Sequence, residues 1–326
     1  MLILSESDLR AVLTMHDVID AVEQGFRALS RGAAVTPERL RLDVPVNGGV
    51  LLEMPAYAEI DGAGALGTKI VSVYEQNARR GLDIVQASYL LLDSETGAPL
   101  SLMDGKFITA IRTAATSGLA TRLMAGPGSK RLALFGAGLQ ARFHLEAMIE
   151  VARIEQVMIA SRTPEKGRAL AEVVRAAHDL PCEVVSAEEA AAKANLICTC
   201  TSSPVPLFDG KLLNAGAHIN AVGAFTPSTR ELDTETIRNA RVIIDAESAA
   251  GREAGELLIP ISEGSVEAGH VRGTLAEVVS GGAAGRESPS EITVFKSCGL
   301  AIEDLVTARL AYSRACAGGF GSQANL

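Results

Sequence analysis

Tryptophan is absent from this chain of 326 residues, and aromatic residues of all kinds make up only 4% of it. Small and aliphatic residues therefore supply most of the hydrophobic fraction of 48%, which is enough to bury a large core. An interior of Ala, Val, Leu and Gly suits α/β packing better than an aromatic-rich β-sandwich. The length predicts two domains at roughly 150 residues each.

Cysteine is also scarce. The five cysteines, Cys182, Cys198, Cys200, Cys298 and Cys316, are odd in number and scattered, so they form no disulfide framework. Strand alternation would place Cys198 and Cys200 on one face, but no further Cys or His stands close enough in sequence to complete a metal site. We therefore expect buried thiols and no metal.

Long hydrophobic runs are missing too. No apolar stretch approaches the roughly 20 residues that span a bilayer. The opening residues MLILSESDLR lack the basic region and the apolar length of a signal peptide. We expect a cytoplasmic protein with no membrane partner. The formal net charge of −9 argues against a nucleic-acid surface, although it leaves room for a local basic pocket.

The first 125 residues show mixed helical and β patterns. A helix is predicted over residues 8–31, and residues 39–100 are typical of strands and turns, with a hairpin turn at 94–97. A long helix is predicted over 106–124. The sequence Gly126-Pro127-Gly128 ends that helix and indicates a domain boundary.

From residue 131 the period changes to short buried strands that alternate with helices, which implies a parallel, doubly wound sheet. The strands are predicted at 131–135, 157–160, 184–185, 196–201, 218–222, 242–245 and 293–295, and the clearest helices at 139–151 and 164–178. A last helix over 300–316 is apolar all round, so we expect it to pack on the first domain or on another subunit. The polar, Gly-rich tail, 318–326, is predicted to be disordered.

A dinucleotide-binding turn is indicated by Gly136-Ala137-Gly138-Leu139-Gln140-Ala141, which follows a predicted strand and opens a predicted helix. Gly136 permits the tight turn, Gly138 lets the backbone approach a pyrophosphate, and Ala141 allows close packing of helix on strand. The helix N-terminus adds free N–H groups and a partial positive charge. We favour this interpretation over a mere packing turn of small residues.

The next predicted strand ends at Ala160-Ser161-Arg162-Thr163. An NAD-specific site places a carboxylate here to accept the ribose 2′-hydroxyl, and this chain has none. Arg162 would instead pair with a 2′-phosphate, unless it is simply an exposed residue at a strand end. We therefore expect NADP to be preferred, with NAD possible.

Two basic residues stand among apolar or small neighbours: Lys69 within a strand and Arg112 within a helix. Such a side chain is either partnered inside the protein or directed at an anion. With Arg39 and Arg41, which flank the first strand region, they would clamp a substrate carboxylate. The residues alone leave both interpretations open.

A set of ordered motifs makes the chain resemble the ornithine cyclodeaminase/mu-crystallin family from about Pro37 to Tyr312. These motifs are Pro37-Glu38-Arg39, Met54-Pro55-Ala56-Tyr57, Thr68-Lys69, Met103-Asp104-Gly105, Arg112-Thr113-Ala114-Ala115, Gly136–Ala141, Gly216-Ala217-His218-Ile219-Asn220-Ala221-Val222-Gly223, Arg230-Glu231-Leu232-Asp233 and Val294-Phe295-Lys296-Ser297-Cys298-Gly299.

The resemblance implies a Rossmann domain inserted into a second, α+β domain that forms homodimers. We accordingly expect residues 126–299 to bind NAD(P), and residues 1–125 with 300–326 to form the substrate and dimerisation domain. The family's substrates are amino acids, cyclic imino acids or the corresponding keto acids, so a small anionic partner is implied.

The resemblance also assigns roles. It makes Lys69 and Arg112 the catalytic residues that bind the substrate carboxylate, with Arg39 as the third basic residue and Arg41 as the competing choice. The candidate cofactor contacts are Arg112, Gly136, Ala137, Gly138, Leu139, Gln140, Ser161, Arg162, Thr163, Thr201, Val222, Gly223 and Ser297.

One departure from the family pattern narrows the chemistry. Ornithine cyclodeaminases carry a catalytic aspartate two residues after the glycine that matches Gly223, and this chain has Phe225 there. A phenylalanine transfers no proton. The sequence is more similar to the ketimine reductases, which reduce Δ1-pyrroline-2-carboxylate or Δ1-piperideine-2-carboxylate to L-proline or L-pipecolate, and Phe225 would form an apolar wall beside the ring.

Three alternatives stay open: an alanine or N-substituted amino-acid dehydrogenase, a cyclodeaminase, and a non-catalytic binder of cofactor or ligand. No Ser–His–Asp arrangement emerges from the five histidines, and His218 is expected to be structural. The sequence names no proton donor.

Overall fold

The computed structural model describes residues 1–325, which form two compact units. The first unit comprises Met1–Thr116 and Leu300–Leu326, and the second comprises Ser117–Gly299. The division falls within helix α3 (Gly105–Met124), whereas the sequence suggested the glycines that follow this helix. None of the helices in the described residues combines the length and the apolar character needed to cross a membrane.

The first unit is built on a mixed sheet with strand order β16-β1-β7-β6-β5-β4-β2, and β3 also pairs with β4. Strands β3 to β7 pair antiparallel, while β1 runs parallel to β7. The strands are β1 (Leu2–Leu4), β2 (Ala34–Val35), β3 (Leu40–Val44), β4 (Gly49–Ile60), β5 (Ala63–Tyr74), β6 (Val85–Leu92), β7 (Pro99–Asp104) and β16 (Ser322–Gln323). Short 3-10 helices, η1 (Pro45–Asn47) and η2 (Glu75–Arg80), follow β3 and β5.

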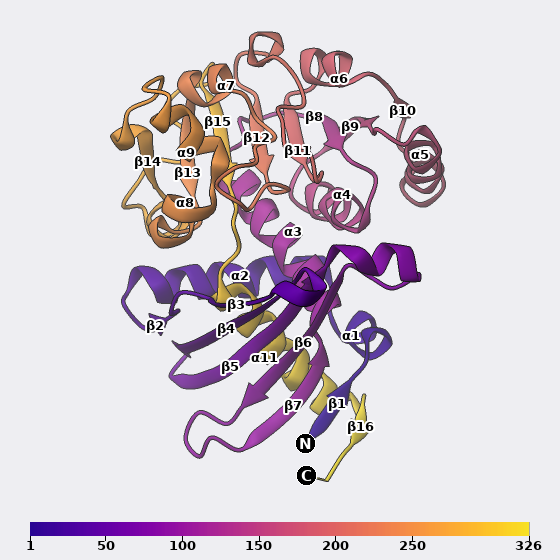
Figure 1. Ribbon diagram of the computed structural model, residues 1–326, viewed down its shortest axis with the longest axis vertical. Coiled ribbons are helices and arrows are strands. Elements are labelled where there is room, and N and C mark those ends of the chain that lie inside the picture. Colours follow the sequence, from indigo (N-terminus) through magenta and orange to yellow (C-terminus); the bar gives the residue numbers. More distant parts are fainter. Residues whose placement is uncertain (326) are drawn as a thin grey trace. The chain divides into compact units, whose positions relative to one another are not determined.

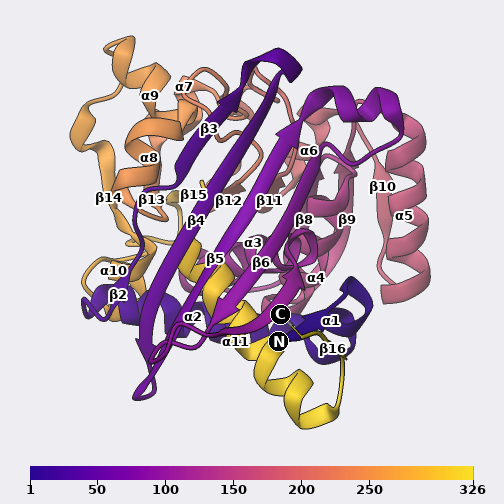
Figure 2. The ribbon, with the colours of Figure 1, turned by 60° about the horizontal axis from the view of Figure 1, so that its bottom comes forward.

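Helices α2 (Met15–Ser30) and α11 (Ala301–Gly318) cover one face of this sheet (Figure 1). Alternate residues of β4, including Met54, Ala56 and Ala58, are buried on that face. The expectation that the apolar last helix packs back on the first domain is confirmed, because α11 lies against β4, β5, β6 and α2. Figure 2 shows the other face of the sheet, with α11 behind the strands.

Two expectations for this unit are wrong. The single helix predicted over residues 8–31 is broken into α1 (Glu6–Val12) and α2. Leu13 and Thr14 are extended, and the Thr14 hydroxyl accepts a hydrogen bond from the backbone N–H of Asp17, so a new helix begins there. Ser5 caps α1, so that helix begins at Glu6.

The tail predicted to be disordered instead forms β16, which pairs antiparallel with β1. The N–H of Ala324 also donates to the carbonyl oxygen of Met1. Leu326, the last residue of the predicted tail, lies outside the described residues.

The second unit is a parallel, doubly wound sheet, as the alternating pattern predicts. Its strand order is β10-β9-β8-β11-β12-β15-β13-β14. The strands are β8 (Lys130–Phe135), β9 (Ile154–Ala160), β10 (Cys182–Val184), β11 (Leu196–Thr199), β12 (His218–Ala221), β13 (Ala240–Ile244), β14 (Val271–Thr274) and β15 (Ile292–Lys296). The helices are α4 (Leu139–Val151), α5 (Pro164–His178), α6 (Ala187–Lys193), α7 (Thr234–Asn239), α8 (Glu247–Glu253), α9 (Gly255–Ser262) and α10 (Leu275–Ser280), with 3-10 turns η3 (Gly210–Leu212) and η4 (Ala268–His270).

The strand order of the second unit fixes where a ligand would bind. From β8 the chain proceeds first to β9 and β10 on one side and then returns to β11 on the other. Ligands of open α/β sheets bind at this reversal, outside the carboxyl ends of the strands. The turn that begins at Gly136 stands at that position, directly after β8.

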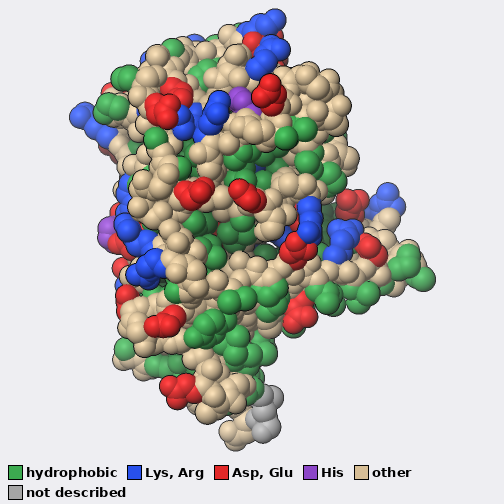
Figure 3. Space-filling view, turned by 90° about the vertical axis from the view of Figure 1, so that its left-hand side faces the viewer, with side chains coloured by type: hydrophobic (Ala, Val, Ile, Leu, Met, Phe, Trp, Pro, Cys, Tyr) green, Lys and Arg blue, Asp and Glu red, His purple; other side chains and the backbone are tan. Residues whose placement is uncertain are grey.

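Charged side chains of both signs intermingle on the surface shown in Figure 3. The net charge of −9 is therefore not gathered into one acidic field on that face.

Candidate active site

The turn after β8 has the geometry that a dinucleotide needs. Gly136 has a φ of 105°, and a Cβ there would stand 2.7 Å from the carbonyl oxygen of Cys200, so only glycine fits. A Cβ on Gly138 would meet no atom within 4 Å, which leaves its backbone open to a ligand. Gly138 is the N-cap of α4, and its own lack of a side chain leaves the first N–H groups of the helix available to an anion. Ala137, Leu139 and Gln140 complete this turn, and the side chain of Leu139 is exposed.

The end of β9 offers a free guanidinium. Ser161 and Thr163 form a local turn, in which the Ser161 hydroxyl accepts from the Thr163 N–H at 3.2 Å. Arg162 is exposed and makes no hydrogen bond or ion pair with another described residue. The nearest following carboxylate, Glu165, is paired with Arg168 at 3.0 Å. The end of β9 therefore presents a guanidinium and no free carboxylate beside the dinucleotide turn.

The remaining candidate cofactor contacts follow three neighbouring strands. Thr201 follows β11, Val222 and Gly223 follow β12, and Ser297 follows β15. Because β11, β12 and β15 are adjacent and parallel, their carboxyl ends meet at one edge of the sheet, beside the turn at Gly136. Phe225 follows in the same loop as Gly223 and is half exposed.

Lys69 and Arg112 lie in a buried charged cluster that the sequence did not reveal. The ammonium of Lys69 lies 2.8 Å from Oδ2 of Asp304. Arg112 donates from Nη1 to Oε2 of Glu303 at 2.6 Å and from Nε to Oδ1 of Asp304 at 3.0 Å. Lys69 and Arg112 are 2% and 5% exposed, and both acidic residues are fully buried. The internal ion pairs, which the sequence left as one of two interpretations, are therefore present in the structure.

Arg39 adds a third cation that acts on this cluster. Two cations and two carboxylates balance one another, and Arg39 is close enough for its charge to lower the pKa of Lys69. Arg41, the competing choice, is exposed and bonded to Asp43 at 2.7 Å. Arg39 therefore acts on this cluster, whereas Arg41 is engaged with its own carboxylate.

Burial sets the protonation of this cluster. Burial and the charge of Arg112 lower the pKa of Lys69 to about 8, although Asp304 opposes the shift. Burial also disfavours the charged form of Arg112, but Asp304 and Glu303 outweigh it and hold its pKa above the usual value. Arg112 is consequently a permanent cation, whereas Lys69 titrates just above neutral pH.

Two hydroxyls near Lys69 lack partners among the described residues. Tyr89 lies directly across from Lys69 in the β5–β6 pair and is fully buried, and its hydroxyl has no hydrogen-bond partner there. The hydroxyl of Thr68 is in the same condition. Buried polar atoms are normally satisfied, so the Tyr89 hydroxyl, on the same face as Lys69, fits a place where a polar ligand or water binds.

The buried histidines are unsuited to proton transfer. His144 contacts the hydroxyl of Ser117 and the carbonyl oxygen of Gln140, and burial lowers its pKa to about 4. Burial lowers the pKa of His218, which contacts the Thr293 hydroxyl at 2.8 Å, to about 3. Both rings are neutral at physiological pH, so neither is a candidate proton donor.

The thiols and carboxylates offer no metal centre. Within residues 1–325, His, Cys, Asp and Glu side chains form no group of three or more that is arranged to hold a metal ion. Cys198 is buried and Cys200 partly so, and burial raises the pKa of Cys198 to about 12.

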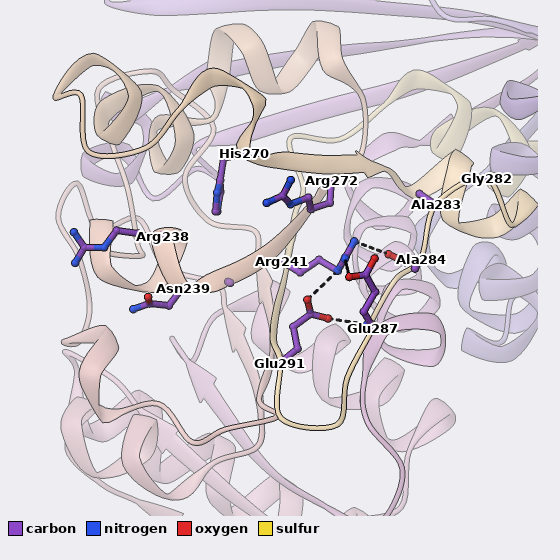
Figure 4. Close-up of a pocket in the computed structure, with 11 residues that line it drawn as sticks. Arg238, Asn239, Arg241, His270, Arg272, Gly282, Ala283, Ala284, Glu287 and Glu291 are labelled. Carbon is purple, nitrogen blue, oxygen red and sulfur yellow. Dashed lines mark hydrogen bonds and ion pairs between the residues drawn. The ribbon is translucent and has the colours of Figure 1, made fainter.

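A separate pocket of about 640 Å³ lies in the second unit near the starts of β13 and β14 (Figure 4). It is lined by Arg241 and Arg272, among others, and Arg241 is paired with Glu287 and Glu291. None of the candidate site residues lines it. Because it stands at the amino ends of parallel strands, it is on the wrong edge for the cofactor.

Known proteins are similar to this chain over nearly its whole length. The sequence profile of the ornithine cyclodeaminase/mu-crystallin family matches residues 1–319. A Δ1-pyrroline-2-carboxylate reductase from Bacillus cereus is 38% identical over 325 residues, which cover 99% of each chain.

Two solved structures are similar over the full length. The Thermococcus litoralis Δ1-pyrroline-2-carboxylate reductase, in complex with NADH and L-proline, has a TM-score of 0.95 and 42% identity, covering 99% of this chain and 100% of that one. An archaeal alanine dehydrogenase dimer with bound NAD has a TM-score of 0.93 and 33% identity, covering 100% and 99%.

Proposed function

This chain belongs to the ornithine cyclodeaminase/mu-crystallin family and is an NAD(P)-dependent oxidoreductase of carbon–nitrogen bonds, and we propose that it uses NADPH to reduce a cyclic imino acid to L-proline or L-pipecolate. The observation that carries this proposal is the buried cluster in which the cations of Lys69 and Arg112 lie on the same side as the unpartnered Tyr89 hydroxyl, with Arg39 close enough to act on Lys69. Buried cations beside an unsatisfied hydroxyl match a substrate that carries a carboxylate.

The chemistry divides between cofactor and chain. When bound, the reduced nicotinamide supplies a hydride to the carbon of the C=N bond, and the ring nitrogen, protonated as an iminium, becomes the amine. The chain supplies orientation: Arg39, Lys69 and Arg112 hold the carboxylate, and Phe225 offers an apolar wall. Orientation of this kind contributes much of the rate, since donor and acceptor carbons react only in near contact.

Phe225 is the reason to prefer reduction over cyclodeamination. Release of ammonia from a diamino acid requires a group that moves protons on the substrate amine and on water. The half-exposed phenyl ring at this position does neither. The similarity to the L-proline-bound Thermococcus litoralis enzyme supports the same choice.

A panel of reactions separates the candidates. We expect NADPH oxidation with Δ1-pyrroline-2-carboxylate or Δ1-piperideine-2-carboxylate to exceed that with pyruvate plus ammonia, which an alanine dehydrogenase would use. The similarity to the archaeal alanine dehydrogenase makes that the second candidate. Ammonia release from L-ornithine without imine reduction would overturn the proposal, and cofactor binding without any turnover would indicate a non-catalytic binder.

The preference for NADPH rests on Arg162. Replacing Arg162 with Ala removes a charge-assisted contact worth about 1.5–3 kcal/mol, so KM for NADPH should rise by roughly tenfold to a hundredfold while KM for NADH stays unchanged. Arg168→Ala on α5 is the matched control, because Arg168 is already paired with Glu165. Equal losses for both cofactors in the Arg162 variant would remove the 2′-phosphate role.

We also propose a homodimer that forms through the open face of the first unit's sheet. Leu40, Leu42, Tyr57 and Ile70 share that face and are 55%, 54%, 40% and 43% exposed. Ile70→Glu should convert a dimer to a monomer in light scattering, whereas a wild-type monomer would refute the proposal.

A further inference from the structure

Glu231 is a fully buried carboxylate with an unusually complete set of donors. Its Oε1 accepts from the backbone N–H and the hydroxyl of Thr201, both at 2.7 Å. Its Oε2 accepts from the hydroxyl of Thr199 and the backbone N–H of Gly223, also at 2.7 Å. One side chain thus joins the segments that follow β11 and β12.

These two segments are held in direct contact. A Cβ on Gly223 would stand 2.1 Å from the carbonyl oxygen of Thr201 and 2.6 Å from Oε1 of Glu231, so position 223 requires glycine. The Glu231 carboxylate and the backbone therefore fill the gap between the strand ends, and no side chain larger than glycine fits at position 223.

A second buried pair supports Glu231 from behind. Its backbone N–H donates to Oε1 of Glu256 at 3.1 Å, and Oε2 of Glu256 lies 3.2 Å from the ammonium of Lys296. Lys296 also donates to the carbonyl oxygens of Ala221 and Ala224. All three charged side chains are fully buried, so the ends of β11, β12 and β15 form one connected polar network.

The position of the network indicates which half of the cofactor it serves. The free Arg162 at the end of β9 places the adenosine half on the β9 side of the turn at Gly136. A dinucleotide that crosses the strand reversal then extends over the ends of β11 and β12. Thr201 and Gly223 consequently stand on the nicotinamide side.

We propose that Glu231 is a positioning residue that fixes Thr201 and Gly223 so that the nicotinamide ring is presented in a reactive geometry. This rests on the proposed function, because it assumes that a dinucleotide binds at this edge. Glu231 touches the backbone behind the cofactor contacts and takes no part in the bond changes. Its removal should reduce hydride transfer more than cofactor capture, because small displacements of reacting atoms cost much of the rate.

Glu231→Gln is the central variant. A glutamine has one acceptor oxygen and an NH₂ group, so in either orientation the NH₂ faces the backbone N–H of Thr201 or of Gly223, which cannot rotate away. We expect kcat for imino-acid reduction to fall by about tenfold to a hundredfold. Binding of 2′-phospho-ADP-ribose, which is NADP without its nicotinamide, should stay within about twofold of wild type. The deuterium isotope effect with NADPH labelled at the transferred position should increase.

Two controls separate positioning from general damage. Glu291 directly precedes β15, and its carboxylate accepts from Arg241 and from the N–H of Glu287. Glu291→Gln removes this carboxylate, so it should lower the melting temperature and leave kcat unchanged. Thr199→Val removes one of the four donors to Glu231 and should lower kcat in the same direction. Thr199→Ser keeps the hydroxyl and should restore most of that loss.

The outcomes are distinct. A Glu231→Gln enzyme with wild-type kcat and isotope effect overturns the proposal, as does a loss of fragment binding equal to the loss of kcat. If Glu231→Gln fails to fold, equal kcat values for the Thr199 variants overturn it instead. If the wild type reduces no imino acid, the proposed function fails. The placement of the nicotinamide is then compared by the fluorescence emission spectrum of bound NADPH, and identical spectra for wild type and Glu231→Gln reject positioning.

Discussion

At the scale of single residues, the two interpretations of Lys69 and Arg112 turn out to be compatible. Both side chains are paired internally, because Asp304 contacts each of them and Glu303 contacts Arg112. Buried charges require such partners. A substrate carboxylate would add to this cluster rather than find an empty basic pocket.

Asp304 should therefore be essential to the fold of the first unit. Asp304→Asn preserves shape but leaves two buried cations with less counter-charge, so the free energy of unfolding should fall by about 3–5 kcal/mol. Chemical denaturation measures this. The control is Asp43→Asn, which breaks the exposed pair with Arg41 and should change stability little. Similar values for both variants would contradict the account of the cluster.

The pH dependence of substrate capture should follow Lys69. Its pKa is lowered to about 8, so the side chain loses its charge, and kcat/KM for the imino acid should fall, as pH rises through 8. Lys69→Arg keeps the charge and should flatten this limb of the pH profile. An unchanged limb in the variant would exclude Lys69 as its source.

The stability effect of Lys69 has the opposite sense. Between pH 8 and the ordinary lysine value of 10.5, the unfolded chain binds more protons than the folded chain. The contribution of this group to stability consequently increases with pH across that window.

The sequence could identify Lys69 and Arg112 because charge is conspicuous among apolar neighbours. It could not identify their partners, since Glu303 and Asp304 lie near the other end of the chain and only the fold brings them alongside. Two adjacent acidic residues at the start of a helix that was expected to be buried were the available signal. Glu231 stood within a family motif, but its four donors come from segments separated from it in sequence.

At the scale of elements, local chemistry made the second unit predictable. Buried strands alternate with helices, and the glycine turn combines a strand, a tight bend and a helix start within a few residues. The failures involve information that is not local. Strand β16 exists because it pairs with β1 at the opposite end of the chain, and no pattern within the tail reports that partner.

The two glycines of the turn allow folding and binding to be tested separately. Gly138→Ala places a methyl group in open space, so the melting temperature should hardly change, while affinity for NADPH should fall because the pyrophosphate loses its close approach. Gly136→Ala forces a Cβ against Cys200 and should lower both. Titration by NADPH fluorescence checks this, and wild-type affinity in Gly138→Ala would place the cofactor elsewhere.

At the scale of the whole molecule, the proposed tasks are assigned to different units. The cluster for the substrate carboxylate is contained in the first unit, and the turn, Arg162 and Glu231 are contained in the second. The similarity to family members extends over both units, so the family shares this pairing of the two units in one chain. The first unit is built from two separate stretches of sequence, and the limit of the first stretch falls within helix α3 rather than at the glycines after it.

The most direct test is to follow the hydride into the product. Incubation of the protein with Δ1-pyrroline-2-carboxylate and NADPH deuterated at the transferred position should yield L-proline with one deuterium at Cα for each NADPH oxidised. Mass spectrometry with chiral chromatography reads this out, and the six-membered imine should be run in parallel to yield L-pipecolate. Failure of both imines to oxidise NADPH, with release of ammonia from L-ornithine, would contradict the account.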